Sequence, residues 1–171
     1  MIFTSQSGLT DTSRSAAWDA WYLGHLDAMA AVPGIGSAQR FAALDPGPPP
    51  SLAMYSIASP AVFESEIYLR TRGMGPWKPL IDPNHYRRNL FDGLDTAPEI
   101  APPGILLVVD RAAPEPTGRG LVWLRAVGLD RSTPFRGLAV LADLPAARAL
   151  AATISGSVAL YQPVTRRYGA P

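Results

Sequence analysis

Cysteine is absent from this chain of 171 residues, and histidine occurs only twice. The lack of cysteine excludes disulfides, thiolate catalysis, iron–sulfur clusters and cysteine-rich zinc sites. It also fits a reducing compartment. Because the two histidines are far apart in the sequence and the carboxylates are scattered, we expect no metal site.

Long hydrophobic runs and an excess of charge are also missing. No apolar stretch approaches the roughly 20 residues of a membrane-spanning helix, and the first residues lack the basic start of a signal peptide. The net charge is +1, and the basic residues are scattered apart from Arg87-Arg88 and Arg166-Arg167. This composition argues against nucleic-acid and membrane partners. We therefore expect a cytoplasmic protein whose partner is a small-molecule substrate.

Motifs that bind nucleotides or activate a serine or a metal-bound water are absent as well. The chain has no Walker loop, no Gly-x-Gly-x-x-Gly after a strand, no Gly-x-Ser-x-Gly and no His-Glu-x-x-His. We expect no cofactor. What is present is enough apolar sequence, 47% hydrophobic residues against 17% charged, for one sizeable core.

One segment carries a clear helical pattern. From about Arg14 the apolar positions recur at steps of four, three, four and three, which places them on one stripe of an α-helix. Pro33-Gly34 then ends the helix, since glycine suits the left-handed position after a helix. The stripe consists of Trp18, Tyr22, His25, Met29 and Val32.

The remaining elements divide the chain into two halves. The first half, residues 1–95, has expected strands at 1–7, 37–44, 52–58 and 85–91, with helices at about 14–32 and from Pro60 to Leu69. A loop with one large aromatic residue, Trp77, is expected at 73–79. After a linker at 96–103, the second half, residues 104–171, has expected strands at 104–110, 121–127, 135–142 and 157–161, with an extension of the last to 166 left open, and a helix at 144–154.

These element orders indicate the fold class. The order β-α-β-β-α-β of the first half is the ferredoxin-like arrangement. A Pro-containing loop at 112–118 stands where the first half has its long helix. We therefore predict an α+β protein with two ferredoxin-like halves, the second lacking or shortening its first helix, packed sheet to sheet.

Four short motifs, considered together, resemble the dimeric α/β-barrel superfamily, and within it EthD-like proteins. The resemblance covers residues 1–95 well and the rest only through element order. The motifs are Trp18-x-x-Trp21-Tyr22-x-x-His25, Val32-Pro-Gly34, Gln39-Arg40-Phe41 and Tyr86-Arg-Arg-Asn-Leu-Phe91.

The resemblance implies two four-stranded sheets that form a barrel around a mostly apolar pocket. Two chains usually supply the sheets, whereas here one chain would supply both, as a monomer with an internal pseudo-dimer or as a homodimer. Members of the superfamily include cyclases, lactone isomerases, cofactor-free monooxygenases and haem proteins, so the fold does not fix the reaction.

His25 and Arg40 are the first candidates for catalysis, and each has a structural alternative. The imidazole of His25 is the natural proton shuttle at neutral pH, or else a core histidine hydrogen-bonded to a carbonyl or carboxylate. Arg40 could hold a carboxylate or enolate oxygen, or else pair with Asp19, Asp27 or Glu66 and so join helix to sheet.

Tyrosine, arginine and asparagine side chains on the strands form a second group. Tyr86 and Arg88 share one face of their strand, whereas Asn89 lies on the other, and the sequence alone does not choose which face lines the pocket. Tyr86 is a candidate to stabilise an oxyanion. Tyr55, Arg88 and Asn89 are candidate substrate-binding residues.

Large aromatic side chains supply candidate walls for the pocket. Trp18, Trp21, Tyr22 and Trp77 could stack on an aromatic substrate, although aromatic residues at helical spacing are more often core. His85 follows Pro83-Asn84 and is typical of a surface turn.

The leading hypothesis is a small cofactor-independent enzyme of isomerase, cyclase or lyase type, acting on an apolar or aromatic oxygenated metabolite. His25 would move a proton α to a carbonyl while Arg40 or a tyrosine stabilises the enolate oxygen. The alternatives are a non-catalytic small-molecule binding protein and a haem protein with His25 as axial ligand.

Overall fold

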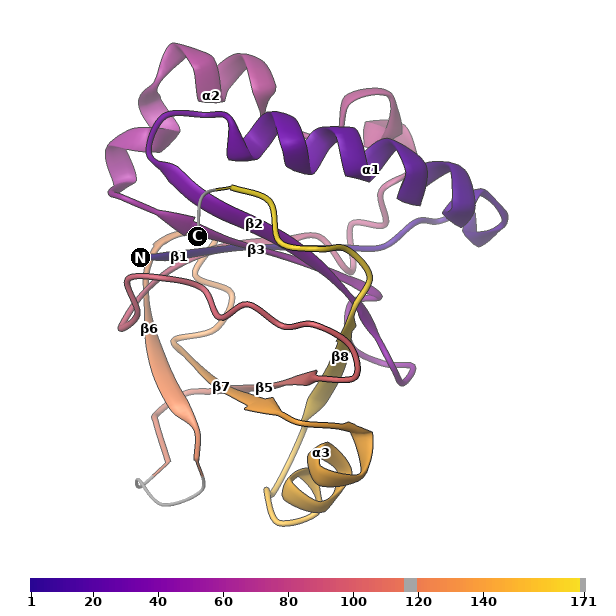
Figure 1. Cartoon of the computed structure of the whole chain (residues 1–171), viewed down its shortest axis with the longest axis vertical. Coiled ribbons are helices and arrows are strands. Elements are labelled where there is room, and N and C mark those ends of the chain that lie inside the picture. Colours follow the sequence, from indigo (N-terminus) through magenta and orange to yellow (C-terminus); the bar gives the residue numbers. More distant parts are fainter. Residues whose placement is uncertain (116–119, 170–171) are drawn as a thin grey trace.

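The computed structural model describes residues 1–115 and 120–169 of the chain. In this part, eight antiparallel strands close into one barrel, and helices lie on its outside (Figure 1). The strands are β1 (Ile2–Ser7), β2 (Ile35–Ala43), β3 (Ser51–Ile57), β4 (Arg87–Asp92), β5 (Ile105–Arg111), β6 (Val122–Leu129), β7 (Phe135–Leu141) and β8 (Ala159–Pro163).

The order of the strands around the barrel is β1-β3-β2-β8-β5-β7-β6-β4. The first half of the chain therefore contributes β4-β1-β3-β2, and the second half contributes β8-β5-β7-β6. Two seams join them, β2 with β8 and β4 with β6, both antiparallel. One chain thus supplies every strand of the barrel, and closure leaves no strand edge unpaired.

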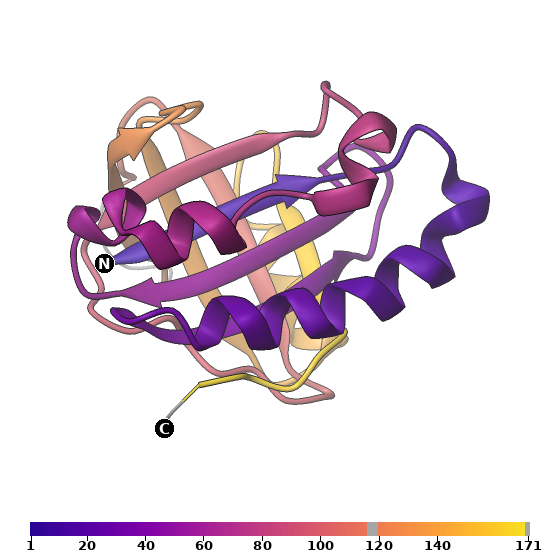
Figure 2. The same ribbon diagram turned by 90° about the horizontal axis from the view of Figure 1, so that it is seen from above.

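The longest helix, α1 (Ser15–Ala30), forms where the apolar stripe predicts it. Its buried side chains are Trp18, Tyr22, Leu26 and Met29. The chain turns into β2 at Gly34, whose φ of +88° is the left-handed conformation that favours glycine. Figure 2 shows α1 and the shorter α2 (Glu66–Thr71) lying across the same face of the sheet formed by β1 to β4.

The region after Pro60 differs from the single helix expected there. It forms a 3₁₀ helix η2 (Pro60–Glu64) and then α2, because Ser65 is extended between them and its hydroxyl accepts the backbone N–H of Tyr68. A further 3₁₀ helix, η3 (Gly75–Leu80), lies in the segment expected to be a loop. β8 ends at Pro163, so the longer strand reaching 166 is not formed.

The second half follows the predicted element order. Its helix α3 (Leu144–Ala151) packs on β5 and β7, on the side of the barrel away from α1. Asp143 caps α3 by accepting the backbone N–H of Ala146. Of the loop expected at 112–118, residues 116–118 lie outside the described part of the chain. No described helix is long and apolar enough to cross a membrane.

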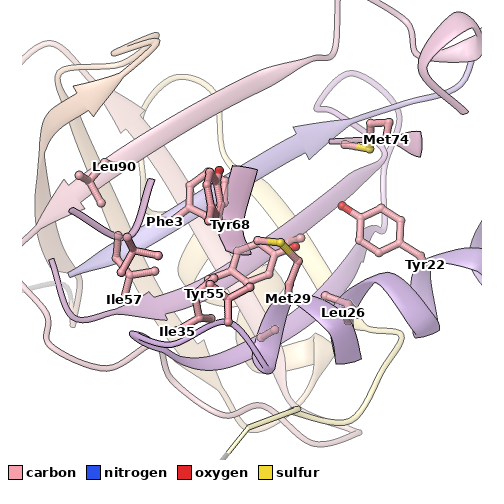
Figure 3. Close-up of a cluster of buried hydrophobic side chains, with 14 of the residues drawn as sticks. Phe3, Tyr22, Leu26, Met29, Ile35, Tyr55, Ile57, Tyr68, Met74 and Leu90 are labelled. Atoms are coloured by element: carbon pink, nitrogen blue, oxygen red, sulfur yellow. The ribbon is translucent and has the colours of Figure 1, made fainter. Parts of the chain in front are cut away.

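Alternation along the strands separates three layers of the core, one of which lies between α3 and the strands β5, β7 and β8. The layer between the sheet and the helices α1 and α2 is shown in Figure 3, where Phe3, Tyr55 and Met29 lie close together. The second layer fills the inside of the barrel with side chains from both halves of the chain. Its members include Ile2, Phe41, Leu52, Met54, Phe91, Leu106, Leu124, Leu138 and Tyr161.

The inside of the barrel also holds a charged side chain. Arg136 on β7 is 1% exposed and donates two hydrogen bonds to Asp110, at 2.7 Å each, and others to Gln6 and Thr4. It therefore links β7 to β5 and β1 through the barrel. The resemblance implied a pocket between the two sheets, but this space is filled by packed side chains.

Candidate functional site

A cleft lies on the outside of the barrel, beneath α1. Its deep part, the inner chamber, has a volume of about 20 Å³, which is room for about one water molecule. Its shallower part, the outer groove, has a volume of about 690 Å³. The two share Arg72, Gly73, Met74, Tyr86 and Arg88 as lining residues, so they are adjacent parts of one cleft.

Two periodicities bring the side chains of the inner chamber together. On α1, Tyr22, His25 and Met29 are three and four residues apart and therefore share one face of the helix. On β3, Tyr55 points to this layer because its neighbour Met54 points into the barrel. Just before and within β4, Tyr86 and Arg88 line the chamber together, as the alternation predicts.

His25 lines the chamber as a neutral, half-buried imidazole. Its ring stacks on Trp21, with centroids 4.8 Å apart, and meets Tyr22 edge to face. Burial lowers the pKa of His25 from 6.5 to about 4. No group in the described part of the chain makes a hydrogen bond to the ring, so at neutral pH it offers one N–H donor and one free lone pair.

The tyrosine hydroxyls of the chamber are proton donors at neutral pH. Burial raises the pKa of Tyr22 to about 12, even though the positive charge of Arg40 acts in the opposite direction. Burial also raises the pKa of Tyr55 and of Tyr68. The chamber therefore combines one potential proton acceptor with several O–H donors.

Arg40 lies beside the chamber but does not line it. Its guanidinium donates to Asp19 at 2.6 Å and to the Ser51 hydroxyl at 2.8 Å. It also lies over the rings of Trp18 and Tyr22, 4.6 and 4.4 Å from their centroids. The structure thus gives Arg40 the alternative arrangement considered from the sequence, an ion pair with Asp19 that joins α1 to β2.

The four remaining predicted residues line neither part of the cleft. Trp21 contacts the lining residues His25 and Tyr22 with its ring, whereas Trp18 is buried beneath Arg40. Trp77 is buried under Arg14 and lines neither part of the cleft. Asn89 points into the barrel, where its side chain bonds twice to Ser132.

Tyr68, Arg72 and Lys78 are among the lining residues of the cleft that were not predicted. Tyr68 and Arg72 are four residues apart and so share a helical face, a signal that the sequence contained. Lys78 lies in η3, where the sequence indicated only a loop with one large aromatic residue.

The described residues bear on whether the site could hold a metal ion or haem. No cluster of three or more His, Cys, Asp or Glu side chains in this part of the chain could hold a metal ion. The inner chamber beside His25, with a volume of about 20 Å³, is smaller than a porphyrin.

Comparison with known proteins adds no name to this site. No protein-family model matches the chain, and no curated protein is significantly similar to it.

Proposed function

We propose that the protein is a small cofactor-independent enzyme that moves a proton on an apolar or aromatic oxygenated metabolite, in a reaction of isomerase, cyclase or lyase type. The observation that carries this proposal is the neutral imidazole of His25, free of hydrogen bonds to described groups, in a chamber lined by tyrosines and Arg88. A proton acceptor next to O–H and N–H donors is the arrangement that enolisation requires.

In the proposed first step, His25 accepts a proton from the carbon α to a carbonyl. The C–H bond breaks, its electron pair forms the enolate, and the new N–H bond makes His25 an imidazolium. The Tyr86 hydroxyl and the Arg88 guanidinium donate to the enolate oxygen. Return of the proton to another carbon completes an isomerisation, and loss of a leaving group completes a lyase reaction.

Arg40 has a positioning role in this proposal rather than a direct one. Its guanidinium is held by Asp19 and Ser51, and it lies over the ring of Tyr22. It therefore fixes the orientation of Tyr22, the residue that packs against the edge of His25.

We also propose that the chain consists of two ferredoxin-like halves related to those of EthD-like proteins. The support is the strand order, β4-β1-β3-β2 in one half and β8-β5-β7-β6 in the other. In each half the strands, numbered as they occur along the chain, stand in the order fourth, first, third, second. The described part of the connection from β5 to β6 contains no helix.

The proposal is tested by exchange of α-protons in D₂O, which needs no knowledge of the natural product. A panel of aryl ketones and aryl keto acids is incubated with the protein, and loss of the α-proton signal is followed by NMR. We expect His25→Ala to slow exchange by roughly 10²- to 10⁴-fold, as loss of a general base does. His85→Ala, which changes the only other histidine and lies outside the chamber, should exchange at the wild-type rate. Near-wild-type exchange by a folded His25→Ala protein would remove His25 from the mechanism.

One observation favours the alternative, a non-catalytic small-molecule binding protein. A general base is commonly oriented by a hydrogen bond to a third group, whereas within the described residues the ring of His25 has ring contacts with Trp21 and Tyr22 and no hydrogen bond. A binding protein would take up compounds from the panel without exchanging their protons.

A further inference from the structure

The outer groove carries positive charge without an acidic counterpart. Arg72, Lys78 and Arg88 line it, and no described Asp or Glu lines either the groove or the inner chamber. Two carboxylates next to groove residues have partners other than the groove side chains. Asp82 lies 3.4 Å from His85, and Asp130 accepts the backbone N–H of Arg88 at 2.7 Å.

Arg72 and Arg88 lie where the groove meets the chamber. Both residues line both parts of the cleft. The Nε atom of Arg88 is buried and has no hydrogen-bond partner, and no described carboxylate pairs with the side chain of Arg72 or Arg88. A buried N–H without a partner is unfavourable, so an acceptor from a ligand would stabilise it.

The rest of the groove is largely apolar. Its surface is formed by Met74, Tyr86, Leu69, Ile81 and Pro83. A ligand held at the arginines can therefore lay an apolar body along this surface. Its volume of about 690 Å³ is ample for a body of one or two rings.

We propose that this cleft selects substrates that carry a carboxylate, held by Arg72 and Arg88 at the junction of groove and chamber, with an aromatic or alicyclic body along the groove. The planar fork of a guanidinium matches the two oxygens of a carboxylate. Because Arg88 and His25 line the same small chamber, the carbon that reacts lies close to the carboxylate. This part of the inference rests on the proposed function, whereas carboxylate binding does not.

Binding is measured by titration calorimetry at low ionic strength with three naphthalene probes. They are 2-naphthoate, its uncharged analogue 2-naphthamide, and 2-naphthyl phosphate. We expect 2-naphthoate to bind at least about tenfold more tightly than the amide, because charge-assisted hydrogen bonds to arginine are lost in the amide. It should also bind more tightly than the phosphate. Added salt should reduce this preference.

Matched variants assign the preference to the two arginines. Arg72→Met and Arg88→Met should each weaken 2-naphthoate binding by about tenfold while leaving 2-naphthamide binding nearly unchanged. Arg70→Met and Arg87→Met are the controls. Arg70 pairs with Glu66 on the same helix, and Arg87 lies on the opposite face of β4 from Arg88. Both should bind 2-naphthoate as the wild type does.

Several results would overturn the inference. These are equal binding of the amide and the carboxylate, tighter binding of the phosphate, no binding of any probe, or equal losses in the control variants. If Arg88→Met fails to fold, Arg72→Met, which changes an exposed side chain, decides. His25→Ala should still bind 2-naphthoate. If this variant keeps the wild-type rate of proton exchange while carboxylate selectivity is intact, the proposed function alone is refuted.

Discussion

His25 differs from the other side chains of the inner chamber because its protonation state can change in mildly acidic solution. Burial lowers its pKa to about 4, so we expect it to be neutral throughout the range in which most cytoplasmic enzymes work. With only two histidines in the chain, the two ring Hε1 resonances can be assigned in NMR spectra with one His85→Gln variant. The His25 resonance should titrate with a midpoint near pH 4, and a midpoint near 6.5 would contradict the burial of its ring.

The same pKa difference predicts a loss of stability in acid. The folded pKa of about 4 lies below the ordinary value of 6.5, so the unfolded chain takes up the proton first as the pH falls. The contribution of neutral His25 is complete above pH 6.5 and is lost between 6.5 and 4. It amounts to about 2–3 kcal/mol.

His25→Phe keeps an aromatic ring at this position and removes the titration. Urea unfolding at pH 7 and pH 4 should show that the wild type loses about 2–3 kcal/mol more stability than His25→Phe over this interval. Equal losses in wild type and His25→Phe would show that the imidazole is not held neutral by burial.

The ion pair of Arg40 with Asp19 gives a further prediction. The side chain of Arg40 is 6% exposed, whereas that of its partner Asp19 is 57% exposed. Asp19→Ala leaves a buried cation with Ser51 and two aromatic faces as its only described partners, and should cost about 1–3 kcal/mol of unfolding free energy. Asp27→Ala, an exposed position on the same helix, should change it by less than about 0.5 kcal/mol. In urea unfolding, Asp19→Ala combined with Arg40→Met should cost less than the two single changes added together. Strict additivity would mean that the ion pair does not join α1 to β2.

Sequence periodicity predicted those parts of the site in which the spacing along one helix or strand determines which side chains share a face. Helical spacing grouped Tyr22 with His25, and alternation grouped Tyr86 with Arg88. Arg40 was ambiguous because β2 carries polar residues on both faces, and Gln39 rather than Arg40 points into the barrel, where its side chain bonds to Ile100. That choice depends on tertiary partners that no local pattern contains.

At the scale of elements, most of the order of helices and strands was predicted from the sequence, because the residues that end elements and the apolar patterns within them agree. Pro33-Gly34 ends α1, and the continuous apolar run of β5 marks a strand whose first five residues are all buried. The sequence could not predict the register in which β2 pairs with β8 and β4 pairs with β6. These seams join residues more than 30 positions apart, as in Phe41 with Pro163, and depend on closure of the whole barrel.

Two glycines, one within α1 and one just after it, should respond to substitution by alanine in opposite directions. Gly24 lies within α1, and a Cβ atom there would meet no atom within 4 Å. Gly34 has a φ of +88°, and a Cβ atom there would lie 2.6 Å from Val62 Cγ2. We expect Gly24→Ala to stabilise the protein by about 0.5–1 kcal/mol and Gly34→Ala to destabilise it by about 1–3 kcal/mol. Midpoints of thermal unfolding measure both. A gain of stability in Gly34→Ala would contradict the left-handed turn between α1 and β2.

At the scale of the whole molecule, the two halves share one interior. Arg136 of the second half bonds to Gln6 and Thr4 of the first, and Leu138 packs with Ile2 and Met54 inside the barrel. The buried layer of either half alone would therefore be exposed to water. This arrangement favours a single unfolding unit over two ferredoxin-like domains that unfold separately.

Tryptophan positions make this cooperativity measurable. Three of the four tryptophans, Trp18, Trp21 and Trp77, belong to the first half, and Trp123 lies on β6 in the second. In a Trp123→Phe protein, fluorescence reports only on the first half, whereas far-UV circular dichroism reports on all strands. We expect the two urea transitions to coincide.

Leu138→Ala, introduced into the Trp123→Phe background, then tests whether a destabilising change in the second half also lowers the unfolding midpoint of the first half. Leu138 is 3% exposed inside the barrel, so its truncation should cost about 2–5 kcal/mol. Because the interior is shared, the fluorescence midpoint of the first half should fall as far as the circular dichroism midpoint. Val140→Ala, two residues along β7 and 48% exposed, should move both midpoints only slightly. If Leu138→Ala lowers the circular dichroism midpoint and leaves the fluorescence midpoint in place, the halves unfold independently and the barrel is not one cooperative unit.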